Sequence, residues 1–328
     1  MSIVLAMLAS TAAGIAPWTE VVVSVRDFEA STRLFRRAGG WRIVSKGRVD
    51  RAELDYWKLP AVARATYQRL CAPAATTGCI RFVRFTGVAQ RPIRRAARPW
   101  DTGGIFSIMV RSDNVPALFD QAIAIGWWAE TDPISFSFKG SDLRNVVLTG
   151  PDGVNLALYQ RISPPFSAFP VGRISQAFNT MRMVRDQPSA KAFYADRLGF
   201  TAIFDDDTTA AEPTPSNFSI PLNYTPKIKR HASALQPVPG ETGRVEVMQI
   251  AGFTGRDLSD QASPPNLGIV SVRYPVAALA AWRRTLEGRG VAIVYAASAV
   301  RVGGLGTTAL LAVRDPDGSI TEFYEAKP

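Results

Sequence analysis

The sequence predicts an α+β protein of four βαβββ modules, which form two cupped mixed sheets with the helices on the outer faces. One observation is an internal repeat, because DPDGSITEFYE at 315–325 has a partial copy, GPDGVNLALYQ, at 150–160. Another is that Val-Arg-Asp separates a strand pattern from an amphipathic helix at 25–27 and again at 184–186. Repetition at a steady offset indicates a duplicated chain. Alternating strands with short amphipathic helices indicate helices layered on sheets.

The first half holds two modules. It opens with a strand and a helix over 18–44, and Asp27 is well placed to cap that helix at its N-terminus. The elements that follow are expected to be strands near 54–59, 65–71 and 79–86, a strand at 105–111, a helix over about 114–126, and strands near 134–138, 144–149 and 154–160. Two such modules would close a cup whose inner face binds a small molecule.

The second half repeats this order. Its expected elements are a strand at 176–184, a helix at 187–198, strands near 200–204, 217–222 and 243–250, a strand at 267–273, a helix at 275–288, and strands at 291–296, 307–314 and 319–325. The predicted domains are residues 18–161 and 173–328, joined by the Pro-rich linker 162–172. The modules pair either within each half or across the halves, and the second arrangement would bring Glu20 and Glu322 into one cup.

The connection over 205–242 contains six prolines and is longer than structureless connections usually are. It is either a lid that folds over the C-terminal cup or a disordered insertion. The sequence leaves both interpretations open.

The net charge of +10 comes mostly from the N-terminal half, since residues 1–162 carry 21 Lys and Arg against 13 Asp and Glu. The densest point is RPIRRAARPWD at 91–101. Such a loop is either simply solvated or a place that attracts an anionic substrate, a membrane face or nucleic acid. No zinc-finger spacing, recognition helix or RNP-like aromatic motif accompanies it, so nucleic acid is not expected as a partner.

The N-terminal segment 1–17 is apolar from Ile3 to Leu8 and then rich in small residues. It is too short to span a membrane, and no basic residue precedes the apolar run. We therefore expect a buried N-terminal arm and a cytoplasmic protein. A signal peptide cleaved near Ala12, and hence export, is the alternative.

The two cysteines, Cys71 and Cys79, flank a predicted turn. They could pair across a hairpin in an oxidising compartment, and they would remain thiols in the cytosol. Their spacing does not predict a metal site, because no further Cys or suitably spaced His completes one.

Four βαβββ modules that open on strand-VRD-helix and close on DPDGSITEF resemble the vicinal oxygen chelate superfamily, which includes glyoxalase I, the bleomycin-resistance proteins and the extradiol dioxygenases. The resemblance covers residues 18–326 and makes each predicted domain glyoxalase-like. It implies a cup that holds a divalent metal. The implied ligands are a residue about seven positions before the Asp on a module's first strand, usually His, and the Glu of the closing strand.

The positions that this resemblance assigns to the metal have mostly lost their ligands. Aligned to them are Glu20, Ile105 or Phe106, Arg84, Ala157, Asn179, Gln249, Leu267 and Glu322. Only Glu322 is intact, and the single histidine, His231, does not align. A metal of this type needs three or four N or O donors. We therefore expect no cofactor, with a metal held by Asn179, Gln249 and Glu322 as the alternative.

A demetallated cup keeps isolated carboxylates in an apolar setting, which suits proton transfer near neutral pH. The expected catalytic residues are Glu322 as base, Tyr324 on the same strand face, and Glu20. The alternative for Glu322 is a relic held by an arginine such as Arg182. The expected substrate-binding residues are Asn179, Arg182, Gln249, Trp57, Phe218 and Tyr224.

The function expected first is that of a metal-independent lyase or isomerase of this superfamily, acting on an apolar and often aromatic small molecule. An enzyme is therefore favoured. The alternative is a non-catalytic protein that binds an aromatic or anionic compound, in the manner of the bleomycin-resistance relatives. The third is a metal-dependent dioxygenase or glyoxalase with atypical ligands. The chain is expected to be a monomer or homodimer without a membrane span.

Overall fold

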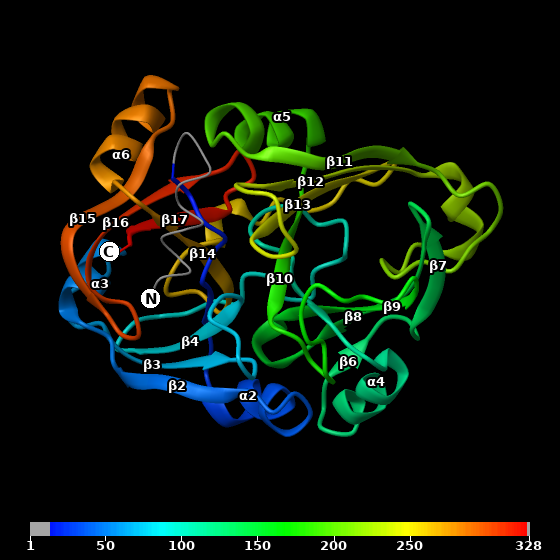
Figure 1. Cartoon of the computed structure of the whole chain (residues 1–328), viewed down its shortest axis with the longest axis horizontal. Helices are drawn as coiled ribbons and strands as arrows, with labels where there is room; N and C mark the ends of the chain where they lie inside the picture. Colours follow the sequence, from blue (N-terminus) through cyan, green and yellow to red (C-terminus); the bar gives the residue numbers. More distant parts are fainter. Residues whose placement is uncertain (1–13, 327–328) are drawn as a thin grey trace.

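The computed structural model describes residues 14–326, which form two curved mixed sheets (Figure 1). The first sheet has the strand order β15-β16-β17-β14-β1-β4-β3-β2. Its strands are β1 (Glu20–Ser24), β2 (Arg42–Arg48), β3 (Arg64–Cys71), β4 (Cys79–Thr86), β14 (Gly268–Val276), β15 (Ile293–Val302), β16 (Gly306–Arg314) and β17 (Ile320–Glu325). We call its inner face cup one.

The second sheet has the strand order β11-β12-β13-β10-β5-β9-β8-β6, with β7 paired to β8. Its strands are β5 (Ser107–Arg111), β6 (Trp128–Ala129), β7 (Ile134–Phe138), β8 (Ser141–Thr149), β9 (Asn155–Ser163), β10 (Ala177–Met183), β11 (Thr201–Thr208), β12 (Lys229–Gln236) and β13 (Arg244–Ala251). We call its inner face cup two. The predicted fold class, with its four modules and two cupped mixed sheets, is confirmed.

The modules pair across the halves of the chain. In cup one, β1 of the first module lies antiparallel to β14 of the fourth. In cup two, β5 of the second module lies antiparallel to β10 of the third. Each sheet therefore contains strands from both predicted domains, 18–161 and 173–328, and neither sheet is built from one half alone.

The helices cover the outer faces of the sheets (Figure 1). They are α2 (Phe28–Arg37), α4 (Val115–Ile123), α5 (Gln187–Ala192) and α6 (Leu279–Gly288). The predicted cap is present, because Asp27 accepts a hydrogen bond from the N–H of Ala30. The largest apolar cluster lies beneath these helices and includes residues of both sheets. Within it, the ring of Phe35 on α2 lies 6.3 Å from the ring of Trp127, which follows α4.

Two predicted strands are wrong. The strand expected at 54–59 is instead helix α3 (Arg51–Tyr56), because the side chain of Asp50 caps its first turn and Arg51 pairs with Asp55 one turn later. Its residue Leu54 packs into cup one. The strand expected at 217–222 is irregular and runs into a 3₁₀ helix at Leu222–Lys227, since Pro221 and Pro226 lack the N–H that a strand ladder needs.

The connection between β11 and β12 covers residues 209–228, and we call it the plug. Its side chains Phe218, Ile220 and Ile228 are buried in the apolar cluster of cup two. The plug thus covers cup two, which modules two and three share, whereas the lid interpretation placed a longer loop, 205–242, over a cup of the C-terminal half.

The N-terminal arm is described only from residue 14, where Ile15 and Ala16 are buried. The signal-like part of the prediction, up to Ala12, lies outside the described residues. Between residues 14 and 326, no helix is long and apolar enough to cross a membrane.

Candidate functional site

Arg273 lies at the centre of cup one and binds three carboxylates. Its Nε donates to Oε2 of Glu322 at 2.6 Å, its Nη1 to Oε1 of Glu20 at 3.1 Å, and its Nη2 to Oε1 of Glu53 at 2.8 Å. The strands impose this meeting, because Arg273 pairs with Glu20 across β1 and β14 and with Glu322 across β14 and β17. None of the four side chains is exposed.

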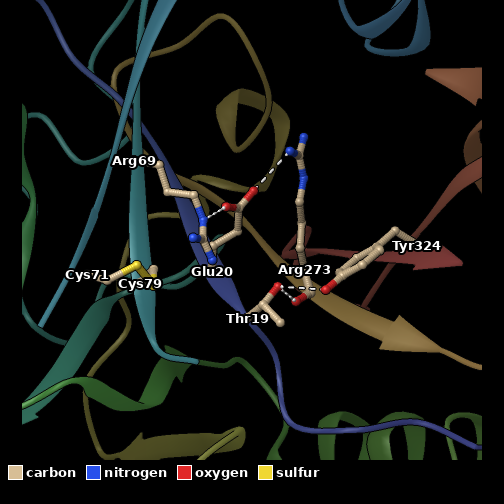
Figure 2. The surroundings of a disulfide bond; sticks show 7 residues. All are labelled: Thr19, Glu20, Arg69, Cys71, Cys79, Arg273 and Tyr324. Carbon is tan, nitrogen blue, oxygen red and sulfur yellow. Dashed lines mark hydrogen bonds and ion pairs between the residues drawn. A yellow bond between two sulfur atoms is a disulfide. The ribbon is translucent and has the colours of Figure 1, made fainter. Parts of the chain in front are cut away.

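Two further arginines complete the network. Arg69 Nε donates to Glu20 Oε2 at 2.7 Å, and Arg81 Nη2 donates to Glu53 Oε2 at 2.9 Å. Figure 2 shows Glu20 held between Arg69 and Arg273. Three carboxylates thus face three guanidinium groups, and the buried charges balance. Burial opposes the charge of Glu20, but the charges of these arginines outweigh it and hold the pKa of Glu20 below its ordinary value.

The remaining oxygen of Glu322 is also occupied. Its Oε1 accepts hydrogen bonds from Ser271 Oγ at 2.7 Å and from Trp57 Nε1 at 3.2 Å. Burial acts against the charge of Arg273, but Glu322, Glu53 and Glu20 hold the pKa of Arg273 well above its ordinary value. Cup one is therefore filled by a closed ion network.

These residues do not fit the divalent metal that the superfamily implies. The guanidinium of Arg273 occupies the position between the carboxylates where a cation would bind. It already donates a hydrogen bond to one oxygen of each carboxylate. Among residues 14–326, no three His, Cys, Asp or Glu side chains are grouped as a metal site would require. Across β1 and β14, Glu20 pairs with Arg273, whereas Leu267, which the alignment placed at the ligand position of the fourth module, precedes β14.

The expected catalytic residues are brought together but enclosed. Glu20 and Glu322 meet through Arg273. Tyr324 makes no hydrogen bond to either glutamate within the described residues, and its hydroxyl donates to Thr19 Oγ1 at 3.2 Å (Figure 2). None of these residues, nor Trp57, lines the two cavities of about 580 and 460 Å³ in the described part of the chain. Both carboxylate oxygens of Glu322 are already held, Oε2 by Arg273 and Oε1 by Ser271 and Trp57, so we do not retain Glu322 as the base.

A disulfide joins Cys71 and Cys79 at the ends of β3 and β4, beside this network (Figure 2). Cys79 also pairs with Glu20 in the register of β1 and β4. Both cysteines are buried. The question that the sequence left open is thus answered in favour of pairing across the hairpin.

In cup two, only one of the three polar residues predicted on β10 and β13 faces the interior. Asn179 lies on the inner face, where it binds Glu246. Arg182 lies on the outer face, over the ring of Tyr194 at 5.5 Å. Gln249 accepts a hydrogen bond from the N–H of Gln187 at the start of α5. Alternate residues of a strand face opposite sides, which separates Asn179 from the other two.

Glu246 is the buried acid that the sequence alignment missed. Asn179 Nδ2 donates to its Oε2 at 3.1 Å, and this is its one side-chain partner among the described residues. Burial raises the pKa of Glu246 to about 7, and the hydrogen bond from Asn179 and the charge of Arg244 offset only part of this. The offset of 165 that aligns Ile80 with Val245 also aligns Arg81 with Glu246, so the repeat contained the signal.

Glu246 has apolar neighbours and one phenol nearby. Met181 is its partner in the register of β10 and β13. Burial, and next the charge of Glu246, raise the pKa of Tyr159, which keeps that phenol protonated. Of the predicted aromatic contacts, Phe218 lies inside the cup, 6.3 Å from the ring of Phe106. Tyr224 lies outside, with 47% of its surface exposed.

The first cavity, of about 580 Å³, opens at the mouth of cup two. Its floor is the inner face of β8 and β9, and its walls are the plug and the basic loop 91–101. Its main lining residues are Arg26, Arg94, Arg95, Arg98, Phe106, Trp128, Glu130, Val147, Thr149, Asp152, Asn155, Asn217 and Ser219.

The arginines of the first cavity differ in how they are held. Arg94 is buried, with its guanidinium donating to the carbonyl oxygens of Gly103, Arg98 and Asp101, and burial lowers its pKa to about 10. Arg95 and Arg98 have no carboxylate partner in the described part of the chain. The basic loop thus places uncompensated positive charge on the cavity wall.

The fold with its two cups is similar to that of solved glyoxalase I structures. The model of the Glyoxalase/Bleomycin resistance protein/Dioxygenase superfamily matches residues 177–323, and this part of the chain belongs to that superfamily. No curated protein matches the sequence.

Two solved structures of glyoxalase I from Zea mays are similar over nearly the whole chain. One is 16% identical, covers 94% of this chain and 92% of its own, and has a TM-score of 0.63. The other, a mutant form of that enzyme, is 15% identical, covers 99% and 96%, and has a TM-score of 0.63. At this identity the likeness establishes the fold alone.

Proposed function

We propose that this protein binds a small, anionic, ring-bearing molecule in the first cavity. The observation that supports this most is the cavity itself, a hollow of about 580 Å³ that joins unpaired arginines to aromatic side chains. Its volume lies in the range of about 300–1,000 Å³ that is usual for small-molecule sites. This is the binding-protein alternative of the sequence analysis, placed in cup two.

The charge of the cavity selects the anion. Arg95 and Arg98 carry guanidinium groups without carboxylate partners in the described structure, and such groups recognise carboxylate, sulfonate or phosphate through paired N–H donors. Of the two acids that line the cavity, Asp152 faces Arg26, with 3.8 Å between Oδ1 and Nε. The cavity therefore attracts negative charge.

The apolar part of the cavity selects the ring. Phe106 and Val147 lie on its floor, and Trp128 stands on its wall with half of its surface exposed. An exposed indole beside a cavity offers a face on which a flat ring stacks. Thr149, Asn155 and Asn217 supply the few polar groups that orient such a ligand.

Affinity for 8-anilinonaphthalene-1-sulfonate, an anionic aromatic probe, tests this function by its fluorescence. Arg98→Gln is expected to weaken binding on the order of tenfold, because it removes a charge-assisted contact. Arg42→Gln, which changes an exposed arginine of β2, is the matched control and should bind as the wild type does. Equal affinity for the wild type and Arg98→Gln would refute the proposal.

A second candidate function is metal-independent proton transfer, as in a lyase or isomerase, with Glu246 as the base. The observation that favours it is a single buried carboxyl group in an apolar cup, with a pKa of about 7. Phe106 lines the cavity and shares an apolar cluster with Met181, the neighbour of Glu246. Displacement of the plug residue Phe218 from Phe106 would connect the cavity to Glu246.

In that reaction the carboxylate of Glu246 takes a proton from a carbon next to a carbonyl group. The protonated hydroxyl of Tyr159 donates a hydrogen bond to the enolate oxygen that forms. Glu246 then returns its proton to that oxygen, which gives the enol and restores the carboxylate. Keto–enol tautomerisation of phenylpyruvate, followed by absorbance, tests this step. Glu246→Gln should abolish the catalysed rate and retain binding of the probe. An unchanged rate would exclude Glu246 as the base.

A further inference from the structure

A second cavity, of about 460 Å³, adjoins the first behind the basic loop. It is lined by Arg26, Gln90, Arg91, Pro92, Arg95, Arg256 and Gln261. Arg26, Pro92 and Arg95 line both cavities, so a single molecule can extend from one into the other. Four of the seven lining residues are arginines, and none is an acid.

Arg256 is fixed in place, and Arg26 faces a carboxylate partner. Arg256 donates from Nε to Asp101 Oδ2 at 3.0 Å and from Nη2 to the carbonyl oxygen of Ala96 at 2.8 Å. Asp152 accepts a hydrogen bond from the backbone N–H of Arg26 at 2.8 Å and faces its guanidinium. Fixed guanidinium groups lose less freedom when they bind a ligand.

The other two arginines are unpaired. Arg91 and Arg95 have no carboxylate partner and no side-chain hydrogen bond among residues 14–326. Asp101, the partner of Arg256, is buried and lines neither cavity. The charge of Arg91 and Arg95 is therefore available to a ligand.

The backbone assembles this cavity from segments far apart in the sequence. The N–H of Ile93 donates to the carbonyl oxygen of Leu267 at 2.8 Å, and the N–H of Leu267 donates to the carbonyl oxygen of Arg91 at 2.9 Å. Gln261 Nε2 donates to the carbonyl oxygen of Ile93 at 3.0 Å. The basic loop is thus bonded to the segment before β14, and this contact holds the four arginines around one space.

We infer that the ligand carries a phosphate group, which binds in the second cavity while its ring lies in the first. This inference rests on the proposed function and adds the substrate class, an aromatic or otherwise ring-bearing phosphate ester. A phosphate carries up to two charges and three acceptor oxygens, so it engages several guanidinium groups at once. A single carboxylate carries one charge, so it would neutralise only one of the two unpaired arginines, Arg91 and Arg95.

A nucleic acid strand is the other anion that arginines attract. The cavities are two bounded hollows of about 580 and 460 Å³, a size that fits a small ester. A strand instead needs an extended basic groove with stacking aromatics. A short oligothymidylate is therefore not expected to compete with a small phosphate ester. Competition at equal or lower concentration would refute the inference that the ligand is such an ester.

Isothermal titration calorimetry with 1-naphthyl phosphate and 1-naphthol measures the contribution of the phosphate group to affinity, because the two compounds share the same ring. The wild type is expected to bind the phosphate on the order of tenfold or more tightly than the naphthol. Arg91→Gln, which changes the second cavity alone, should remove most of that preference and leave naphthol affinity unchanged. Arg91→Lys should restore part of the preference for the phosphate, because lysine carries the same charge but lacks the planar guanidinium that binds two phosphate oxygens. Arg42→Gln is again the control.

The outcomes distinguish this inference from the proposed function. If Arg91→Gln keeps the full phosphate preference while Arg98→Gln weakens binding, the second cavity is not a phosphate site and the proposed function stands. If neither naphthyl compound binds, the proposed function fails. If the oligothymidylate displaces 1-naphthyl phosphate at equal or lower concentration, the ligand class inferred here is wrong.

Discussion

Arg273 and Glu322 lie side by side on adjacent parallel strands, with 2.6 Å between Nε of Arg273 and Oε2 of Glu322. Glu322 belongs to the DPDGSITEF motif, which is the most specific sequence signature of the superfamily in this chain. Its carboxylate is neutralised by a guanidinium in a site without exposed surface. Cup one is therefore filled by a buried ion network, and the binding surface that we propose lies at cup two.

Removal of Arg273 should destabilise the protein strongly. Arg273→Met leaves three buried carboxylates without their shared partner, and breaking a buried ion pair costs about 3–5 kcal/mol. Urea denaturation followed by tryptophan fluorescence measures the free energy of unfolding. Arg42→Met, on exposed β2, is the matched control. A loss below about 1 kcal/mol for Arg273→Met, close to the usual range of surface substitutions, would show that the network is dispensable.

Divalent metals should neither bind nor stabilise the wild type. Each carboxylate in cup one already binds a guanidinium, so a cation would have to displace Arg273. We expect no rise in Tm with excess Mn²⁺, Ni²⁺ or Zn²⁺ and no fall with a chelator. Mass spectrometry for metals on the purified protein completes the test. Stoichiometric metal that is lost together with stability on chelation would contradict this account.

The pH dependence of stability should reveal Glu246. Its pKa rises from 4.5 to about 7 on folding, because burial disfavours the charged form. A carboxyl group with a raised pKa stabilises the fold when it is protonated, and this contribution is complete below about pH 4.5 and is lost as the pH rises through about 7.

Glu246→Gln keeps the acceptor for Asn179 and removes the titration. The variant should therefore exceed the wild type in stability by about 3 kcal/mol at pH 8, and the difference should vanish near pH 4.5. Denaturation midpoints at both values measure it. A difference that does not change with pH would place the pKa of Glu246 near its ordinary value.

The disulfide should stabilise the β3–β4 hairpin. Its cysteines are eight residues apart, and closing a loop of this length contributes about 2.5 kcal/mol in the chain-entropy model. The double variant Cys71→Ala/Cys79→Ala should lose this amount, and reductant should affect the wild type alone. Thiol alkylation under non-reducing conditions checks the pairing. Two reactive thiols in the unfolded, unreduced protein would show that the disulfide is absent.

The repeat and the alternating strands were sufficient to predict the four modules and two sheets. They could not predict the pairing, because β1 has the same alternating pattern whichever module lies beside it. The antiparallel contact between β1 and β14 joins residues about 250 positions apart, and only the packed fold specifies it. The strand expected at 54–59 failed for a local reason, since the Asp50 cap favours a helix over the apolar run.

The candidate site was only partly predictable. The ligand positions of the superfamily identified Glu20 and Glu322, but the charge of both carboxylates is neutralised by Arg273. The alignment did not include Arg273, because it assigned the ligand position of the fourth module to Leu267. Glu246 was overlooked because the same alignment selected Gln249, three residues along β13 and on its opposite face. The basic loop at 91–101 was visible as charge, whereas the cavities appear only when that loop packs against the other half of the chain.

A structure of the protein with 8-anilinonaphthalene-1-sulfonate bound tests the central claim most directly. The naphthalene ring is expected to lie against Phe106 and Trp128 at the mouth of cup two, with the sulfonate toward Arg95 and Arg98. Density for the probe in cup one, beside Trp57 and Arg273, would contradict it.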